Sequence, residues 1–132
     1  MIVLDASAVV AVLLGPGQEA KRLRERIETS GESLHVPHVM DLEVLNTLRR
    51  YVLLGILSLK RGSEALEDLE NIAFFRYPHT PLAERIWALR ENLTACDAAY
   101  VALAEALDAP LVTTDARLAR APGIRAAVEV YH

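Results

Sequence analysis

Two short β-prone segments at opposite ends of this 132-residue chain each run into an aspartate. Residues 2–4 lead directly to Asp5, and residues 111–113 are followed by Thr114 and Asp115. Short strands that are apolar throughout are typical of the centre of a parallel sheet, where both faces are covered. Ligands of such sheets bind beyond the carboxyl ends of the strands, where the strand order reverses. Both aspartates are therefore expected beside a ligand-binding crevice.

The rest of the chain alternates between strand and helix patterns. Strands are expected at 2–4, 34–36, 73–77, 111–113 and 126–130, and the segments between them carry helical periodicity, the fifth helix being capped by Thr80 before Pro81. This alternation predicts an α/β fold: a three-layer α/β/α domain spanning residues 1–132 around a five-stranded, mainly parallel sheet. The two helices within 39–72 are expected to project from the sheet as a helical arm.

Composition excludes several classes of protein. The net charge of -4 gives no overall basic field, which counts mildly against a non-specific nucleic-acid binder, although twelve of the fourteen basic residues are Arg. Cys96 is the only cysteine, so no intrachain disulfide can form. The apolar start of the chain has no basic residue before Lys21 and is too short to span a bilayer. We therefore expect a cytoplasmic protein without a membrane segment.

Four acidic residues occupy positions where they could form a site, and each also has a structural explanation. Asp5 and Asp115 precede helices and could be N-caps. Asp97 lies three residues after Thr94, the spacing of a capping box. Glu43 lies in the second turn of a largely apolar helix, so its carboxylate is either exposed or buried with a partner. Convergence favours a site, because aspartates at the ends of adjacent β/α units point into one crevice.

The pattern resembles the PIN-domain family, most closely its small VapC-type toxins of toxin–antitoxin pairs. Four segments carry the resemblance: MIVLDASAVVAVLL at the start, EVLNTLRR from Glu43, LTACDAAYVALAEAL from Leu93 and LVTTDARLAR from Leu111. The resemblance implies an acidic site made of Asp5, Glu43, Asp97 and Asp115, with the Thr114 hydroxyl beside it. It also implies that Ser7 and Asn46 support the site.

The chemistry of such a site follows from its donors. Carboxylate oxygens are hard ligands that suit Mg²⁺ or Mn²⁺, and two such ions about 3.5–4 Å apart can serve phosphodiester cleavage. On this interpretation Asp5 and Asp97 bind metal directly, while Glu43 and Asp115 bind a second metal or orient its waters. Thr114 would position a phosphate or a water of the metal. The resemblance implies an endoribonuclease that leaves a 5′ phosphate and a 3′ hydroxyl.

Substrate and partners are expected from the same interpretation. Arg90, Arg117 and Arg120 are candidates for contacts to RNA phosphates. The resemblance suggests a homodimer and a small antitoxin protein as partners, and the apolar residues around Gly55 in the arm need a covering surface.

Two other classes of α/β protein fit the sequence less well. A receiver domain needs a late lysine, but none follows Lys60, and a haloacid-dehalogenase phosphatase needs Asp-x-Asp where this chain has Asp5-Ala6-Ser7. A PIN nuclease of RNA processing or DNA metabolism outside a toxin pair stays open. So does a non-catalytic RNA- or protein-binding module, although a mere binder of polyanions has no use for an acidic pocket.

The acidic cluster should also be costly without metal. Four carboxylates about 5–6 Å apart would repel by roughly 3 kcal/mol per close pair at an effective dielectric constant near 20. We therefore expect one acid to have a raised pKa. Replacing Asp115 by Asn is expected to stabilise the metal-free protein.

Overall fold

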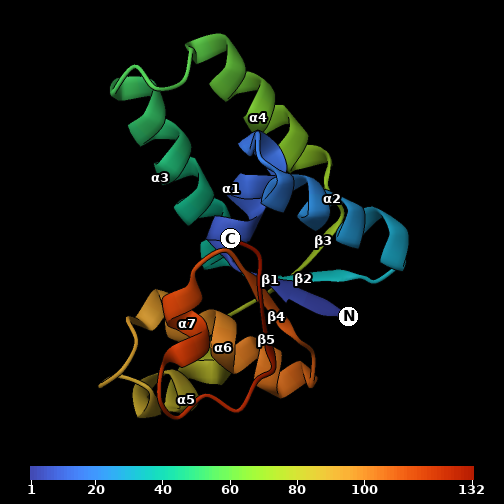
Figure 1. Ribbon diagram of the computed structural model, residues 1–132. Helices are drawn as coiled ribbons and strands as arrows, with labels where there is room; N and C mark the ends of the chain where they lie inside the picture. The colour runs from blue at the N-terminus through green and yellow to red at the C-terminus, as the bar shows by residue number, and fades with distance from the viewer.

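A single parallel sheet with strand order β3-β2-β1-β4-β5 organises the molecule (Figure 1). The computed structural model describes all 132 residues. Along the chain the elements are β1 (Ile2–Leu4), α1 (Ala6–Leu14), α2 (Gln18–Ser30), β2 (Leu34–Pro37), α3 (Val39–Leu53), α4 (Leu59–Asn71), β3 (Phe74–Tyr77), η1 (Thr80–Leu82), α5 (Ala83–Ala88), α6 (Ala95–Leu107), β4 (Leu111–Thr113), α7 (Ala116–Arg120) and β5 (Val128–Val130). The predicted α/β class and five-stranded sheet are confirmed, and all four strand pairings are parallel.

Strand β1 lies at the centre, and the strand order reverses beside it. β1 pairs with β2 on one side and with β4 on the other, with Val3 opposite both His35 and Leu111. The backbone N–H of Asp5 donates to the carbonyl of Val112 at 3.1 Å, which extends the β1–β4 pairing by one residue. The crevice at the reversal point therefore lies between the residues that follow β1 and β4.

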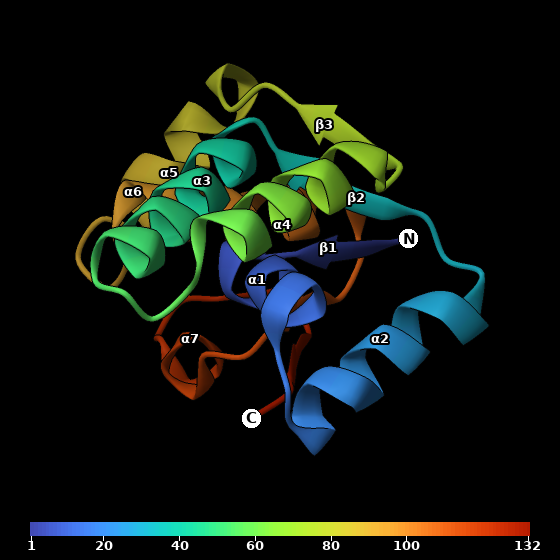
Figure 2. The ribbon, with the colours of Figure 1, turned by 90° about the horizontal axis from the view of Figure 1, so that it is seen from above.

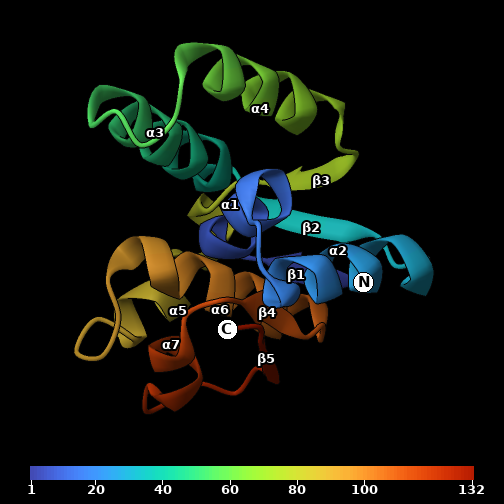
Figure 3. The same ribbon diagram turned by 45° about the horizontal axis from the view of Figure 1, so that its top comes forward.

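Helices cover both faces of the sheet (Figure 3). Helix α6 packs across β1, β2 and β4 on one face, with α5 outside it. Helix α1 covers the other face and is itself flanked by α2, α3 and α4. Residues 98–104 of α6 are all buried, as the nearly continuous apolar sequence of this helix predicts. The small alanines let the helix approach the sheet closely.

Helices α3 and α4 form the predicted arm and run side by side (Figure 2). Met40, Val44 and Leu48 form the buried side of α3. Gly62 allows α4 to approach α3, because an added Cβ there would meet a Val52 methyl at 2.9 Å. The turn between the two helices and the helix ends beside it expose large apolar side chains: Leu53, Leu54, Ile56 and Leu59.

The segment around α5 differs from the prediction. Thr80 begins a 3-10 turn instead of capping an α-helix, and α5 starts at Ala83 without a side-chain cap. The helix ends at Ala88 rather than near residue 91, and the buried Leu89 begins a series of hydrogen-bonded turns in which its carbonyl accepts the N–H groups of Asn92 and Leu93. No helix anywhere in the fold combines the length and the apolar character needed to cross a membrane.

Candidate active site

Asp5 is the most buried of the four predicted acids. It caps α1, and its Oδ1 accepts hydrogen bonds from the backbone N–H of Ala8 at 2.9 Å and from the Ser7 hydroxyl at 2.6 Å. Its Oδ2 accepts a hydrogen bond from the Thr113 hydroxyl. Only 6% of Asp5 is exposed, and this burial raises its pKa, although the hydrogen bonds partly offset the effect. Asp5 is thus both an N-cap and a costly buried carboxylate.

Two neighbouring threonines behave differently at the end of β4. The Thr113 hydroxyl contacts Asp5 and accepts the backbone N–H of Asp115 at 3.0 Å. The Thr114 backbone N–H donates to the Ser7 hydroxyl at 3.1 Å, while the Thr114 residue lines an adjacent pocket. The hydroxyl that contacts Asp5 therefore belongs to Thr113. A catalytic role for Thr114 stays a prediction.

Glu43 is half-buried on α3 and has a buried partner. The Tyr100 hydroxyl, from α6, donates to its Oε1 at 2.6 Å, and Tyr100 is only 1% exposed. Burial raises the pKa of Glu43, the Tyr100 hydrogen bond lowers it, and the negative charges of Asp97 and Asp5 raise it again. Glu43 is therefore a half-buried carboxylate with a buried hydrogen-bond partner, between the two alternatives that the sequence allowed.

Asp97 joins Asp5 and Glu43 in one electrostatic cluster. It lies in the first turn of α6, where the Thr94 hydroxyl caps the helix by accepting the Asp97 N–H at 3.2 Å. Its charge contributes to the raised pKa of both Asp5 and Glu43. The side-chain carboxylate of Asp97 receives no hydrogen bond from another residue. Asp5, which follows β1, Glu43 on α3 and Asp97 on α6 therefore lie close enough for their charges to interact.

Asp115 has a different environment from the other three acids. It caps α7 by accepting the Arg117 N–H at 2.9 Å, and its carboxylate pairs with the Arg117 guanidinium, with two N···O distances of 3.2 Å. This pairing lowers the pKa of Asp115. The expected mutual repulsion of four acids is therefore wrong in this respect, because Arg117 neutralises one of them.

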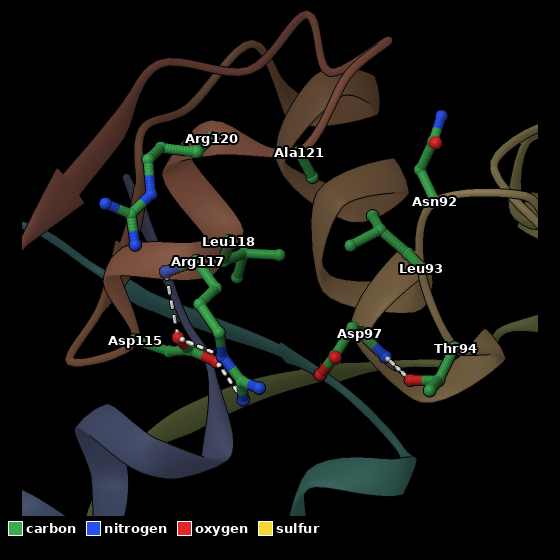
Figure 4. Close-up of a pocket in the computed structure, with 9 residues that line it drawn as sticks. All are labelled: Asn92, Leu93, Thr94, Asp97, Asp115, Arg117, Leu118, Arg120 and Ala121. Atoms are coloured by element: carbon green, nitrogen blue, oxygen red, sulfur yellow. Dashed lines mark hydrogen bonds and ion pairs between the residues drawn. The ribbon is translucent and has the colours of Figure 1, made fainter.

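A pocket of about 460 Å³ separates Asp97 from Asp115. It lies between α6 and α7, and the Asp97 carboxylate points toward the Asp115–Arg117 pair (Figure 4). Arg120 also lines this pocket, whereas the Arg90 guanidinium lies 4.8 Å from the ring centroid of the exposed Trp87. A phosphate contact by either arginine stays a prediction. The pocket therefore joins two acids and two arginines in a polar cavity beside the buried Asp5.

No group of three His, Cys, Asp or Glu side chains is already arranged to hold a metal ion. The His35 side chain is buried, and its two ring nitrogens form hydrogen bonds with the hydroxyl groups of Ser33 and Tyr77 at 2.7 and 2.6 Å. Both nitrogens are therefore already engaged and do not serve as metal ligands here. Ser7 supports Asp5 as the resemblance implied, while Asn46 is exposed on α3.

Two site residues were not anticipated from the sequence: Tyr100 and Thr113. Tyr100 did carry a signal, because a phenol inside an otherwise apolar buried helix needs a hydrogen-bond partner. Thr113 carried none, since threonine is common in strands for its β-branched shape alone.

Comparison with known proteins gives a consistent result. The family model described as PIN domain matches residues 2–124. Ribonuclease VapC9 of Mycobacterium tuberculosis is 48% identical over 118 residues, which cover 89% of this chain and 88% of VapC9. The crystal structure of PAE2754 from Pyrobaculum aerophilum matches with a TM-score of 0.73 at 26% identity, covering 98% of this chain and 83% of that one. A toxin–antitoxin complex from Klebsiella pneumoniae shares the fold. The match has a TM-score of 0.66 at 22% identity and covers 100% of this chain and 98% of that one.

Proposed function

Since the chain belongs to the PIN-domain family, we propose that it is a metal-dependent endoribonuclease and the toxin of a VapBC-type toxin–antitoxin pair. The observation that supports this proposal is the position of Asp5 at the end of β1, where the strand order reverses, with Glu43 and Asp97 near enough for their charges to act on one another. An acidic cluster of this kind has no use in a protein that only binds polyanions. The 48% identity to Ribonuclease VapC9 supports RNA as the substrate.

The donor chemistry of the site fits Mg²⁺ or Mn²⁺. All the candidate ligands are carboxylate oxygens, and these are the ligands that hard divalent cations prefer. Asp97 has a carboxylate free of protein hydrogen bonds, and Glu43 uses only Oε1 for Tyr100. Because no three acids are yet in a coordinating arrangement, cation binding would require these carboxylates to move closer together. Asp115 would complete the set by exchanging Arg117 for the cation.

The chain's own residues then have distinct tasks in hydrolysis. When bound, the divalent cation supplies an activated water and stabilises the charge that develops on the phosphate. Asp5, held by Ser7, Ala8 and Thr113, fixes the position of the site, because its hydrogen bonds leave it little freedom. Arg117 and Arg120 would bind phosphate oxygens on the α7 side. The products are a 5′ phosphate and a 3′ hydroxyl.

Cleavage of RNA by the purified chain tests the proposal. Activity should appear with Mg²⁺ or Mn²⁺ and stop with EDTA, and Asp97→Asn should abolish it. Asp108→Asn is the matched control, because Asp108 ends the same helix and holds a left-handed conformation, with φ of 50°, that asparagine also accepts. Full activity in Asp97→Asn would refute the assigned site.

We also propose that the chain forms a homodimer and binds a small antitoxin. The exposed leucines and isoleucine of the arm support this, as does an apolar groove of about 320 Å³ beside Trp87, which is 68% exposed. Light scattering at micromolar concentration should give twice the chain mass, and a monomer would contradict the dimer. An antitoxin should copurify when the chain is expressed with its neighbouring genes, and it should suppress cleavage.

A further inference from the structure

A second pocket adjoins the acidic cluster on the side of α1 and α3. It has a volume of about 390 Å³, and its walls include Ser7, Val10, Thr47, Arg50, Tyr51 and Thr114. One of its walls connects directly with the site, because the Ser7 hydroxyl donates to the Asp5 carboxylate. Thr47 lies one helical turn after Glu43 on α3, and its hydroxyl donates to the Glu43 backbone carbonyl at 3.1 Å. A ligand in this pocket would therefore be continuous with one at the acids.

Arg50 is the only cationic residue of this pocket, and no carboxylate neutralises it. It takes part in none of the ion pairs of the chain. Arg117, on the opposite flank of the site, is instead bound to Asp115. A free guanidinium presents its N–H donors in a fork that matches two phosphate oxygens. It would also offset the repulsion that the acids exert on an incoming phosphodiester.

Tyr51 limits the freedom of Arg50. The guanidinium carbon lies 5.5 Å from the ring centroid, within range of a cation–π interaction. Tyr51 is half-buried and lines the same pocket. Holding a long side chain in one place lowers the entropy lost when it binds an anion. The guanidinium is thus positioned at the pocket before any ligand arrives.

We propose that this pocket binds the nucleotide next to the scissile phosphate of an RNA substrate, with Arg50 on its phosphate and Tyr51 positioning Arg50. The proposal rests on the ribonuclease function proposed above. The pocket volume falls in the range of small-ligand sites, roughly 300–1,000 Å³. A strand seated there would pass Thr114 and the acids and continue into the pocket beside Arg120. RNA would therefore cross the end of the sheet from α3 to α7.

Salt-dependent RNA binding separates a phosphate contact from a general surface charge. In an Asp97→Asn background, which keeps RNA intact, a fluorescent single-stranded RNA is titrated against protein at several salt concentrations. Arg50→Ala should weaken RNA binding about tenfold, because the variant loses one charge-assisted hydrogen-bonded contact. It should also reduce the slope of log Kd against log salt by about 0.7, the value for one phosphate contact on a single strand. Arg49→Ala removes the same charge from the adjacent exposed position, outside the pocket, and should leave the slope unchanged.

Variants of Tyr51 test the positioning role. Tyr51→Phe keeps the aromatic ring and should bind RNA like the parent, whereas Tyr51→Leu should weaken binding although Arg50 is intact. Circular dichroism melting checks the fold of Tyr51→Leu, and if that variant does not fold, the Arg50 and Arg49 pair decides alone. Equal affinity and slope for Arg50→Ala and Arg49→Ala would overturn the subsite while the parent still cuts RNA. A wild-type chain that neither binds nor cuts RNA would instead refute the ribonuclease function.

Discussion

Replacing Asp5 by Asn should change how the stability of the metal-free protein depends on pH. Burial raises the pKa of Asp5 above its unfolded value, so the folded state holds the proton more tightly. A carboxyl of this kind contributes stability below the unfolded pKa, and that contribution is lost as pH rises through the folded pKa. Wild type should therefore lose stability from acidic toward neutral pH on account of Asp5, and Asp5→Asn should not.

The size of the effect follows from the contacts of Asp5. One titrating group changes the free energy of unfolding by at most about 1.4 kcal/mol per pH unit. The helix cap survives, because Asn caps as well as Asp and its Oδ1 can still accept the Ala8 N–H. The cost arises at Oδ2, where an amide would replace the oxygen that accepts the Thr113 hydroxyl. Losing that one hydrogen bond costs about 1 kcal/mol. Asp5→Asn is therefore more stable than wild type at neutral pH only where removing the buried charge of Asp5 stabilises the folded state by more than this amount.

Urea titrations in EDTA between pH 4 and pH 8 measure the effect. The difference in unfolding free energy between Asp5→Asn and wild type should grow in favour of the variant as pH rises. Asp115→Asn is the comparison of opposite sign. Arg117 lowers the pKa of Asp115, which therefore contributes stability above its unfolded pKa and loses it on acidification. Asp115→Asn should thus be less stable than wild type at neutral pH, contrary to the expectation from sequence. A difference between Asp5→Asn and wild type that stays constant with pH would refute the reasoning.

Three further outcomes follow from the same structure. Tyr100→Phe removes the hydrogen bond that lowers the pKa of Glu43, so the acidic limb of the pH profile of RNA cleavage should move to higher pH. Burial lowers the pKa of His35, so its contribution to stability should fall as pH drops below the unfolded value of about 6.5. Urea titrations from pH 7.5 to 5 should show that the free energy of unfolding depends less on pH in His35→Gln than in wild type. His79→Gln, at an exposed position, is the control and should not show this change. Excess Mn²⁺ should stabilise wild type by about 2.7 kcal/mol at one hundred times its Kd, measured by melting, and the shift should be much smaller in Asp97→Asn.

The sequence predicts the fold well where burial dictates the pattern. β1 and β4 are buried along their whole length, and the observed bounds agree with the predicted 2–4 and 111–113 because each β-prone run is followed by a polar residue. The edge strand β5 is shorter than predicted, since its residues are only partly buried and the sequence pattern is weak there. Helix α5 ends at Ala88, before the predicted end near residue 91, and no glycine or proline in the local sequence marks that point.

The site is predictable as a set of acids but not as a set of contacts. Convergence of Asp5, Glu43 and Asp97 follows from helices and strands that meet at one end of a parallel sheet, and that much is visible in the sequence. The register of β4 against β1 determines whether the hydroxyl of Thr113 or that of Thr114 contacts Asp5, and these two threonines are adjacent in the chain. One residue along a strand reverses the face to which a side chain points. A sequence pattern does not resolve that difference.

The acids differ in how many hydrogen bonds their carboxylates accept, and this difference indicates a separate role for each. Asp5 accepts three hydrogen bonds and Glu43 accepts one, whereas the Asp97 carboxylate accepts none from the protein. A carboxylate fixed by buried hydrogen bonds gains little by moving, so Asp5 suits the role of a fixed reference at the end of β1. Asp97 is the least constrained and has its lone pairs available, so a cation meets least competition there. Asp115 has to give up Arg117 before it can act as a ligand, and the released guanidinium then becomes free for a phosphate. In the proposed metal-dependent reaction, cation binding and phosphate binding on the α7 side would therefore be coupled through the Asp115–Arg117 ion pair.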